Sequence, residues 1–459
     1  MVTLTIKAKQ LNQRVEGKDD MMATELKLVR TLAEDTLKST MIEHKKQPAQ
    51  SAEIMNLRDQ AAVIFAKNGL PNKRVEAWKY TDLKQAMSQV ANSAPLALKE
   101  ADVVISKQLH AQSALASVPV HAWIAGGFTL NQPLPHGVKI DVFSPTTHGQ
   151  WLGKALALAA ENAAVQLNNA LINDIIVVHV AAGETVEEPL HLGFVAPWNE
   201  AAAVYSRVLV IVEKGASLTL IEHQLSHNGI KHQINSVVEV VIADNASCHH
   251  IRLNAHGDDA LVLSTLGVQL GDHAVLNAHN IVIAPAFSRH QVFTSYHGEH
   301  AQANINGVSL LKGKQHADNT LIVDHAQPHG SSREIFKTVL DGAATGVFQG
   351  QIQVKAKAQK TDGRMSSNAL MLSDECTMYN KPELEIFADD VQCAHGATCG
   401  ALDDDLLFYL LARGISRKDA EGLMVHAFVG EALEGIEHED VRNGLSSLIQ
   451  SWVEGRASA

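Results

Sequence analysis

A β-solenoid flanked by α-helical regions at both ends is the fold class that this 459-residue sequence predicts. Short runs rich in Val and Ile follow one another from Asp174 to Ala356 almost without helical periodicity, and Gly, Asn and Asp separate them. A turn motif recurs between these runs at a nearly fixed spacing. Helical patterns with one apolar face occupy both ends of the chain. Together these observations predict a mainly β protein.

The recurring turn motif ends in an alanine and precedes a strand-like run. Its alanines are Ala216, Ala246, Ala274 and Ala301, spaced 30, 28 and 27 residues apart. A spacing that drifts by a residue or two is typical of stacked coils with variable turns. A small alanine suits the tight corner of a coil, and inward Val, Ile and Leu fill its narrow core. The alternative is a β-sandwich, but about 280 strand-rich residues would make an oversized one.

The sequence of residues 1–118 predicts an N-terminal helical region. Nothing in residues 1–45 indicates a function, and we treat them as a candidate flexible segment. Apolar residues from Ile54 to Phe65 share one helix face. Gly69 and Pro71 follow this pattern as residues that end a helix.

The next boundary is predicted near residue 119, where a β-helix core spanning 119–395 begins. Trp78 and Tyr80 are expected to anchor the helical region on that core. Residues 84–118 are rich in Ala, Ser and Gln and predict a soft connection. Within the core, the Ala- and Leu-rich stretch 151–169 predicts one inserted helix.

Residues 396–459 predict a C-terminal domain of three helices. The first, 403–413, begins with acidic residues and ends with a basic one, as the helix dipole favours. Ser416 opens the second as an N-cap, and the third covers about 439–454. Three short helices bury little by themselves, so we expect them to pack on the end of the solenoid or on a partner.

Composition excludes several classes of protein. The net charge of −12 argues against broad binding to nucleic acid or to anionic membranes. No apolar run is long enough to span a bilayer, and the N-terminus lacks the apolar core of a signal peptide. Four cysteines are too few for a disulfide scaffold and suit reduced thiols. We therefore expect a cytoplasmic protein.

Residues 389–400 concentrate the side chains most suited to metal or sulfur chemistry. They include Asp389, Asp390, Cys393, His395 and Cys399. Thiolates and imidazoles favour zinc, iron or sulfur over magnesium or calcium. Neighbouring strand residues point to opposite faces, so at most one of the two aspartates is expected to face such a site. The competing interpretation is a buried thiol and a hydrogen-bonded histidine at a strand end.

Eight segments of the chain resemble a known family. They are Glu76–Leu83, Val339–Lys355, Ala358–Asp362, Ser367–Ser373, Pro382–Ile386, Asp390–Thr398, Leu407–Ile415 and Ala420–Leu433. Together they resemble the SufB/SufD scaffold proteins of the Suf iron–sulfur cluster assembly machinery, over nearly everything from about residue 50 onward. This resemblance implies an N-terminal helical region, a right-handed parallel β-helix and a C-terminal helical domain.

The same segments resemble the SufD branch of the family more than the SufB branch. SufB-type chains carry an essential cysteine just before a Leu-x-Leu run, whereas Gly363–Leu372 of this chain has none. The form Cys-x-His-Gly-Ala-Thr at Cys393–Thr398 is likewise the SufD pattern.

The resemblance implies partners and site residues. The chain would form a heterodimer with a SufB-like paralogue through the β-helix ends, and its C-terminal helices would dock a SufC-like ATPase. His395 matches the histidine at the site of the nascent cluster, facing the SufB cysteine, and Cys393 matches the neighbouring cysteine. Cys399 departs from the family pattern and is not assigned as a ligand. The iron–sulfur cluster or its precursors would be transient cargo, with no tightly bound cofactor and an open question over flavin. Homodimerisation in the partner's absence also stays open.

Two other functions compete with this scaffold role. A β-helix carbohydrate-active enzyme would need two carboxylates about 5–10 Å apart, for which Asp318 and Asp324 are candidates. A purely structural adaptor would need no metal chemistry at all. The sequence contains no phosphate-binding Gly-x4-Gly-Lys-Ser/Thr loop, so any dependence on ATP must come from a partner chain, and the protein itself is expected to be non-catalytic.

Overall fold

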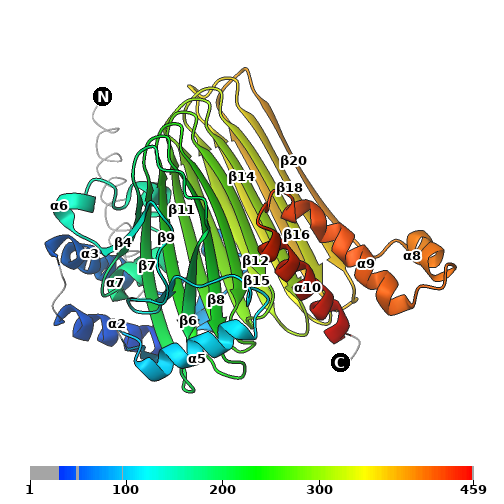
Figure 1. Ribbon diagram of the computed structural model, residues 1–459, viewed down its shortest axis with the longest axis horizontal. Helices are drawn as coiled ribbons and strands as arrows, with labels where there is room; N and C mark the ends of the chain where they lie inside the picture. Colours follow the sequence, from blue (N-terminus) through cyan, green and yellow to red (C-terminus); the bar gives the residue numbers. More distant parts are fainter. Residues whose placement is uncertain (1–29, 48–50, 96, 457–459) are drawn as a thin grey trace, which may run out of the picture.

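The centre of the molecule is a β-solenoid of two facing parallel sheets, as the computed structural model in Figure 1 shows. The structure describes residues 30–47, 51–95 and 97–456. Odd-numbered strands form one sheet: β5 (Ile176–Val180), β7 (Ala202–Val212), β9 (Gln233–Ile242), β11 (Leu261–Leu270), β13 (Phe287–Tyr296), β15 (His316–His325), β17 (Thr345–Val354) and β19 (Thr377–Ile386). Even-numbered strands form the other: β6 (Leu190–Ala196), β8 (Ser217–Ser226), β10 (Ser247–Ala255), β12 (Val275–Val282), β14 (Gln302–Leu311), β16 (Ser331–Leu340), β18 (Asp362–Met371) and β20 (Gln392–Gly400). The predicted solenoid is confirmed.

Each strand pairs in register with the strand one coil before it, so equivalent residues stack in columns along the solenoid. Alternate residues point into the space between the sheets, where Val, Leu, Ile and Ala form the main core. Residues of the other parity face outward, and helices cover many of them. The column to which a residue belongs therefore decides whether it faces the core or a covering helix.

The predicted alanine corners join odd strands to even strands. Ala216, Ala246, Ala274 and Ala301 are all buried there. Each follows a residue in the left-handed region: Gly215 (φ 68°), Asn245 (φ 56°), His273 (φ 53°) and His300 (φ 57°). This backbone turns the chain sharply, and a methyl group is the largest side chain that the stacked corners hold beside it. The corner prediction is thus confirmed with a physical cause.

Antiparallel strands begin the solenoid. The strand β4 (Val138–Val142) pairs with β5, and β3 (Phe128–Leu130) pairs with β2 (Ala122–Ile124), which in turn joins β6. The short β1 (Asn92–Ser93) adds to β7.

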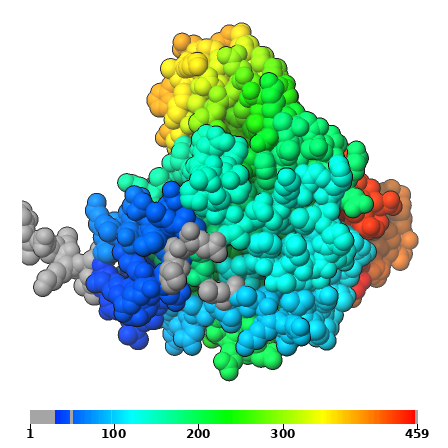
Figure 2. Space-filling model, turned by 60° about the vertical axis from the view of Figure 1, so that its left-hand side comes forward, coloured from blue at the N-terminus to red at the C-terminus, as the bar shows by residue number. Residues whose placement is uncertain are grey.

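Helices cover the outer face of the odd-numbered sheet near this end, and Figure 2 shows the blue N-terminal helices forming that side of the molecule. They are α2 (Leu32–Lys45), α3 (Ala52–Asn68), η1 (Glu76–Trp78), α4 (Leu83–Ala86), α6 (Pro145–His148), η2 (Lys154–Ala159) and α7 (Ala163–Leu171). The predicted helix before Gly69 is α3, and Gly69 caps it with φ 65°. Part of the segment 1–45 forms α2, whose Leu37 and Met41 are buried in this cluster, and residues 1–29 lie outside the described residues.

Two local predictions were wrong. The segment 84–118 is not only a soft connection, because it contains α5 (Glu100–Ala111), which lies across the outer face of β6 and β8 (Figure 1). The stretch 151–169 is not one helix. The side chain of Asn162 accepts hydrogen bonds from the amides of Ala164 and Val165, so a new helix, α7, begins after η2.

The C-terminal helices are α8 (Asp404–Leu411), α9 (Arg417–Gly430), η3 (Glu431–Leu433) and α10 (Glu439–Arg456). The N-cap prediction for Ser416 is confirmed, since its side chain accepts from the amide of Asp419. Apolar residues of α9 and α10 pack on the outward residues of the even-numbered sheet. We expected these helices to pack on the end of the solenoid or on a partner. They instead cover one face of the solenoid. Among the described residues, no helix is long and apolar enough to cross a membrane.

Trp78 and Tyr80 anchor the N-terminal region on the solenoid, as predicted. The buried Trp78 ring lies 4.0 Å from the guanidinium of Arg289, and Tyr80 stacks on Tyr379 at 4.8 Å between ring centroids. The buried carboxylate of Asp318 accepts hydrogen bonds from Arg289 and from the hydroxyl of Thr81. A cation, an aromatic ring and a carboxylate thus join two distant parts of the chain.

Candidate functional site at the open end of the solenoid

The solenoid ends in two strands, β19 and β20, that each pair on one side only. Figure 1 shows β20 at the far edge, beyond β18 and away from the N-terminal helices. Most of β20 is exposed, and so are three apolar side chains of β19 and the residue after it: Tyr379, Ile386 and Phe387. Unpaired edges of this kind offer backbone groups to another chain.

Pairing with β18 fixes the direction of Cys393 and His395. Cys393 lies opposite Gly363, and His395 lies opposite Met365, which is buried in the main core. Both residues therefore belong to columns that face the space between the sheets. Two positions apart on one strand, their Cβ atoms lie about 7 Å from each other. In the last coil these columns are open, so His395 is exposed and Cys393 is half-buried.

The Cys393 thiol is not activated in this chain alone. Burial raises its pKa, and the nearby carboxyl groups of Asp362 and Glu334 raise it further, although a hydrogen bond from the backbone of Gly363 acts in the opposite direction. The thiolate is the form that binds metal or attacks sulfur. A metal ion or a positively charged partner group would have to lower this pKa before Cys393 could react.

The remaining residues of the predicted segment are arranged differently. Asp389 and Asp390 lie in a bend before β20, so the expectation of opposite faces of a strand does not apply to them. Asp390 forms an ion pair with Lys360. Cys399 is exposed, and the amide of Asn380 lies 3.5 Å from its sulfur.

Glu334 is a buried acid near this end that the sequence analysis did not single out. It lies opposite Met365 on the neighbouring strand, in the same column as His395. Its side chain is fully buried, and neither carboxylate oxygen makes a hydrogen bond of normal geometry to a described residue. Burial raises its pKa to about 8, and Ser332 and Arg333 offset only part of that rise. Inward and outward residues alternate along β16, and this alternation places Glu334 between the inward residues Ser332 and Phe336. That pattern in the sequence could have identified Glu334 as a buried acid.

Cys393 and His395 do not form a complete metal site by themselves. Within the part of the chain that the structure describes, no third histidine, cysteine or carboxylate gathers with them at ligand distance. Stable iron or zinc sites in proteins use three or four protein ligands. Any metal or cluster bound here would need further ligands from outside this chain.

The carbohydrate-enzyme alternative is wrong in its geometry. Asp318 and Asp324 both face outward from β15, but six residues along a strand separate them by about 20 Å. Glycosidic acids need to lie within about 10 Å. Asp318 is also paired with Arg289, and Asp324 forms an ion pair with Lys355.

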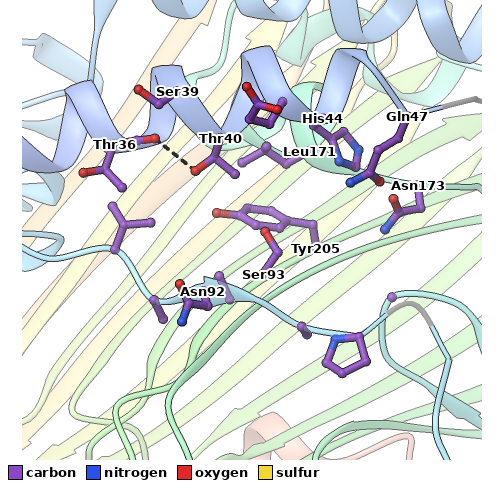
Figure 3. Close-up of a pocket in the computed structure, with 17 residues that line it drawn as sticks. Thr36, Ser39, Thr40, His44, Gln47, Asn92, Ser93, Leu171, Asn173 and Tyr205 are labelled. Carbon is purple, nitrogen blue, oxygen red and sulfur yellow. Dashed lines mark hydrogen bonds between the residues drawn. The ribbon is translucent and has the colours of Figure 1, made fainter.

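A separate hollow of about 590 Å³ lies between α2, residues 90–95 and β7 (Figure 3). The hydroxyl groups of Thr36, Ser39 and Thr40 line one wall, and the ring of Tyr205 lies across from them. The hollow is at the opposite end of the molecule from β20 and contains none of the predicted site residues.

Comparisons with known proteins cover most of the chain, including the residues at this end. The model of the SUF system FeS cluster assembly SufBD core domain matches residues 195–428, and that of the SufBD protein N-terminal region matches 40–192. The iron–sulfur cluster assembly protein SufD of Escherichia coli is 27% identical over 85% of this chain and 91% of its own. A SufBD family protein of Synechocystis is 28% identical over 83% and 87%, and SufD of Bacillus subtilis is 25% identical over 64% and 67%.

Proposed function

Because the chain belongs to the SufBD family of iron–sulfur cluster assembly proteins, we propose that it is a SufD-type scaffold subunit. It pairs with a SufB-like paralogue through the open end of the solenoid and helps to hold a nascent iron–sulfur cluster there. The subunit is a non-catalytic scaffold, and the cluster or its precursors are cargo that leaves after assembly.

The incomplete ligand set at β20 is the observation that supports this proposal most. His395 and Cys393 face into the last, uncovered coil, next to an exposed strand edge and three exposed apolar side chains. A second solenoid packed end to end would extend both sheets, bury those apolar groups and bring its own ligands to the same columns. The remaining ligands would then come from the partner, including the cysteine that the family resemblance assigns to SufB.

The chemistry of the two candidates suits temporary binding. A neutral imidazole at His395 donates one lone pair to iron and is displaced more readily than a thiolate. Cys393 would bind iron or accept sulfur only as the thiolate, so its raised pKa keeps it protonated until a metal or the partner approaches. This difference makes His395 the primary ligand in our proposal and Cys393 the second.

Docking of a SufC-like ATPase is the finer part of the proposal. Helices α8 and α9 leave apolar side chains exposed, namely Leu406 (46%), Phe408 (73%), Tyr409 (51%), Leu411 (37%) and Leu423 (55%). Exposed apolar groups concentrated on one short segment favour a protein partner. Because the sequence has no phosphate-binding loop, that partner would supply the ATP hydrolysis.

Anaerobic co-expression with SufB-like and SufC-like partners tests the proposal. The complex is isolated by size-exclusion chromatography, and its iron, its sulfide and its visible absorbance are measured for the wild type and for His395→Ala. We expect the variant to assemble normally but to lose most of the cluster. Cys393→Ser should reduce the cluster less.

His300→Ala, at an exposed corner far from β20 in the sequence, is the matched control and should keep the full cluster. If His395→Ala assembles with its cluster intact, the chain is a structural adaptor without a ligand role. If no complex forms with the SufB-like partner, the scaffold pairing itself is wrong.

A further inference from the structure

Three histidines from separate elements meet on the outer face of the even-numbered sheet. His110 comes from α5, His191 from β6 and His223 from β8, and Figure 1 shows α5 lying across these two strands. The ring centroids are 5.4 Å apart for His110 and His191, 5.8 Å for His110 and His223, and 5.6 Å for His191 and His223. One ring nitrogen from each lies within 4.8 Å of the other two.

Each of these rings has at least one nitrogen with no hydrogen-bond partner among the described residues. The unpaired atoms are Nδ1 of His110, Nε2 of His191 and both ring nitrogens of His223. His191 and His223 are fully buried, so water does not solvate these atoms from the outside. Leaving buried polar nitrogens unpaired is costly, and native proteins seldom do so without a bound group.

The other nitrogen of His191 is held in the way that metal-binding histidines usually are. Its Nδ1 lies 3.2 Å from the backbone carbonyl of Val118. A ring N–H donated to a carbonyl fixes the tautomer and directs the opposite nitrogen toward a metal. This arrangement leaves Nε2 of His191 as a free lone pair, and Nδ1 of His110 likewise has no partner among the described residues.

All three imidazoles are neutral at physiological pH. Burial lowers the pKa of His191 to about 3 and that of His223 well below its usual value, and it lowers the pKa of His110 as well. Neutral rings offer lone pairs without first releasing a proton. A set of three imidazoles without a carboxylate favours zinc, cobalt, nickel or copper over magnesium or calcium.

We propose that His110, His191 and His223 form a binding site for a divalent cation of the zinc type, distinct from the candidate site at β20. Tetrahedral zinc holds its nitrogen ligands about 3.3 Å apart, so small side-chain rotations close the gap from the observed arrangement. An open hollow of about 380 Å³, lined by His110, Trp123 and Asn131, touches the cluster at His110. The column of β8 lies six strands from β20, about 29 Å away.

A bound cation would tie α5 to the solenoid. The apolar contacts of this helix with the sheet include a small cluster in which Val103 and Leu109 are only partly buried. The metal would therefore stabilise this segment specifically, and the site differs from the cargo site in using only this chain's ligands.

Metal binding to the full-length chain tests the inference without any partner. The protein is stripped with a chelator, dialysed against limiting Zn²⁺ or Co²⁺, and its metal content is measured by mass spectrometry. We expect about one tightly bound Zn²⁺ per chain and an intense visible Co²⁺ spectrum of tetrahedral type. Zinc should also raise the thermal unfolding temperature. His110→Ala, at the half-buried position, should lose the spectrum and bind at least about 100-fold more weakly.

The matched control is His300→Ala, which removes the middle of an exposed histidine stack formed by His273, His300 and His329. Such a stack is the competing place for adventitious metal. Retention of binding by this variant and its loss in His110→Ala support the site. Binding that disappears in His300→Ala, or that is equal in all forms, or that is absent from the wild type, overturns it. A second variant, His223→Phe, should also lose the Co²⁺ spectrum. Circular dichroism checks that each variant folds, and if His223→Phe does not fold, the result for His110→Ala decides.

Discussion

Glu334 and His395 stand in one column of the even-numbered sheet, two strands apart, with Met365 between them. Neighbouring strands lie about 4.8 Å apart, so the column runs about 10 Å from a buried carboxyl group to an exposed imidazole. Burial keeps the carboxyl group protonated at neutral pH, since its pKa is about 8. The stability of this end of the solenoid is therefore tied to pH.

The change Glu334→Gln should alter how stability depends on pH. Between about pH 4.5 and 8 the folded state holds a proton on Glu334 that the unfolded state releases, so this group lowers stability as pH rises, by up to roughly 1.4 kcal/mol per pH unit. Glutamine keeps the shape but cannot ionise. Denaturant unfolding is measured from pH 5 to 9. The free energy of unfolding of the variant should rise relative to that of the wild type up to about pH 8, and the difference should then stay constant. The exposed change Glu375→Gln is the control, and a pH-independent difference for Glu334→Gln would contradict the assignment.

The buried side chain of His325 should lower the stability of the protein in acid. It is buried against Tyr296, with 4.1 Å between the ring centroids, and burial lowers its pKa from 6.5 to about 3. The unfolded state takes up a proton below about pH 6.5 while the folded state does not, so stability falls as pH drops from 6.5 toward 3. His325→Phe removes this loss of up to roughly 1.4 kcal/mol per pH unit. Acid unfolding measures it, and an unchanged acid slope relative to wild type would show that His325 is not the group responsible.

Trp78→Ala should loosen the N-terminal region from the solenoid. The ring is buried over Arg289, and its loss leaves a cavity beside a buried ion pair. We expect a loss of about 3–5 kcal/mol in the free energy of unfolding. Limited proteolysis should also cut the segment before residue 90 faster. Val63→Ala, at a position that is 67% exposed, should change stability by less than about 0.5 kcal/mol. Equal effects of the two changes would contradict the anchor.

Three of the four cysteines should differ in their rates of alkylation in a definite order. Cys399 is exposed and should react first, while Cys393 is half-buried with a raised pKa and should follow. Cys248 is buried and its pKa is raised to about 12, so it should react only on unfolding. Mass spectrometry of iodoacetamide-treated protein over time gives the order. Faster labelling of Cys393 than of Cys399 would mean that the Cys393 thiol is activated in the free chain.

The sequence by itself determined the architecture. The drift of the alanine spacing follows from stacked corners, each of which needs a left-handed residue and then a small one, so Ala216, Ala246, Ala274 and Ala301 mark the coils. The segment around Cys393 and His395 could also be selected, because ligand type and local pattern are properties of neighbouring residues. Family resemblance extended this to a function that the matched family models share at the coarse level.

Only the tertiary structure decided which distant residues meet. Periodicity could not reveal that α5 covers the solenoid, because the surface on which Val103 and Leu109 pack comes from distant strands. Nor could it bring His110 next to His191 and His223, which depends on the packing of a helix across two strands. The burial of Glu334 required the register of β16, and the pairing of Asp318 with Arg289 required the register of β13 against β15. The pattern of neighbouring residues determines turns, strands and helices. Contacts between distant residues depend on which face of the sheet each helix covers.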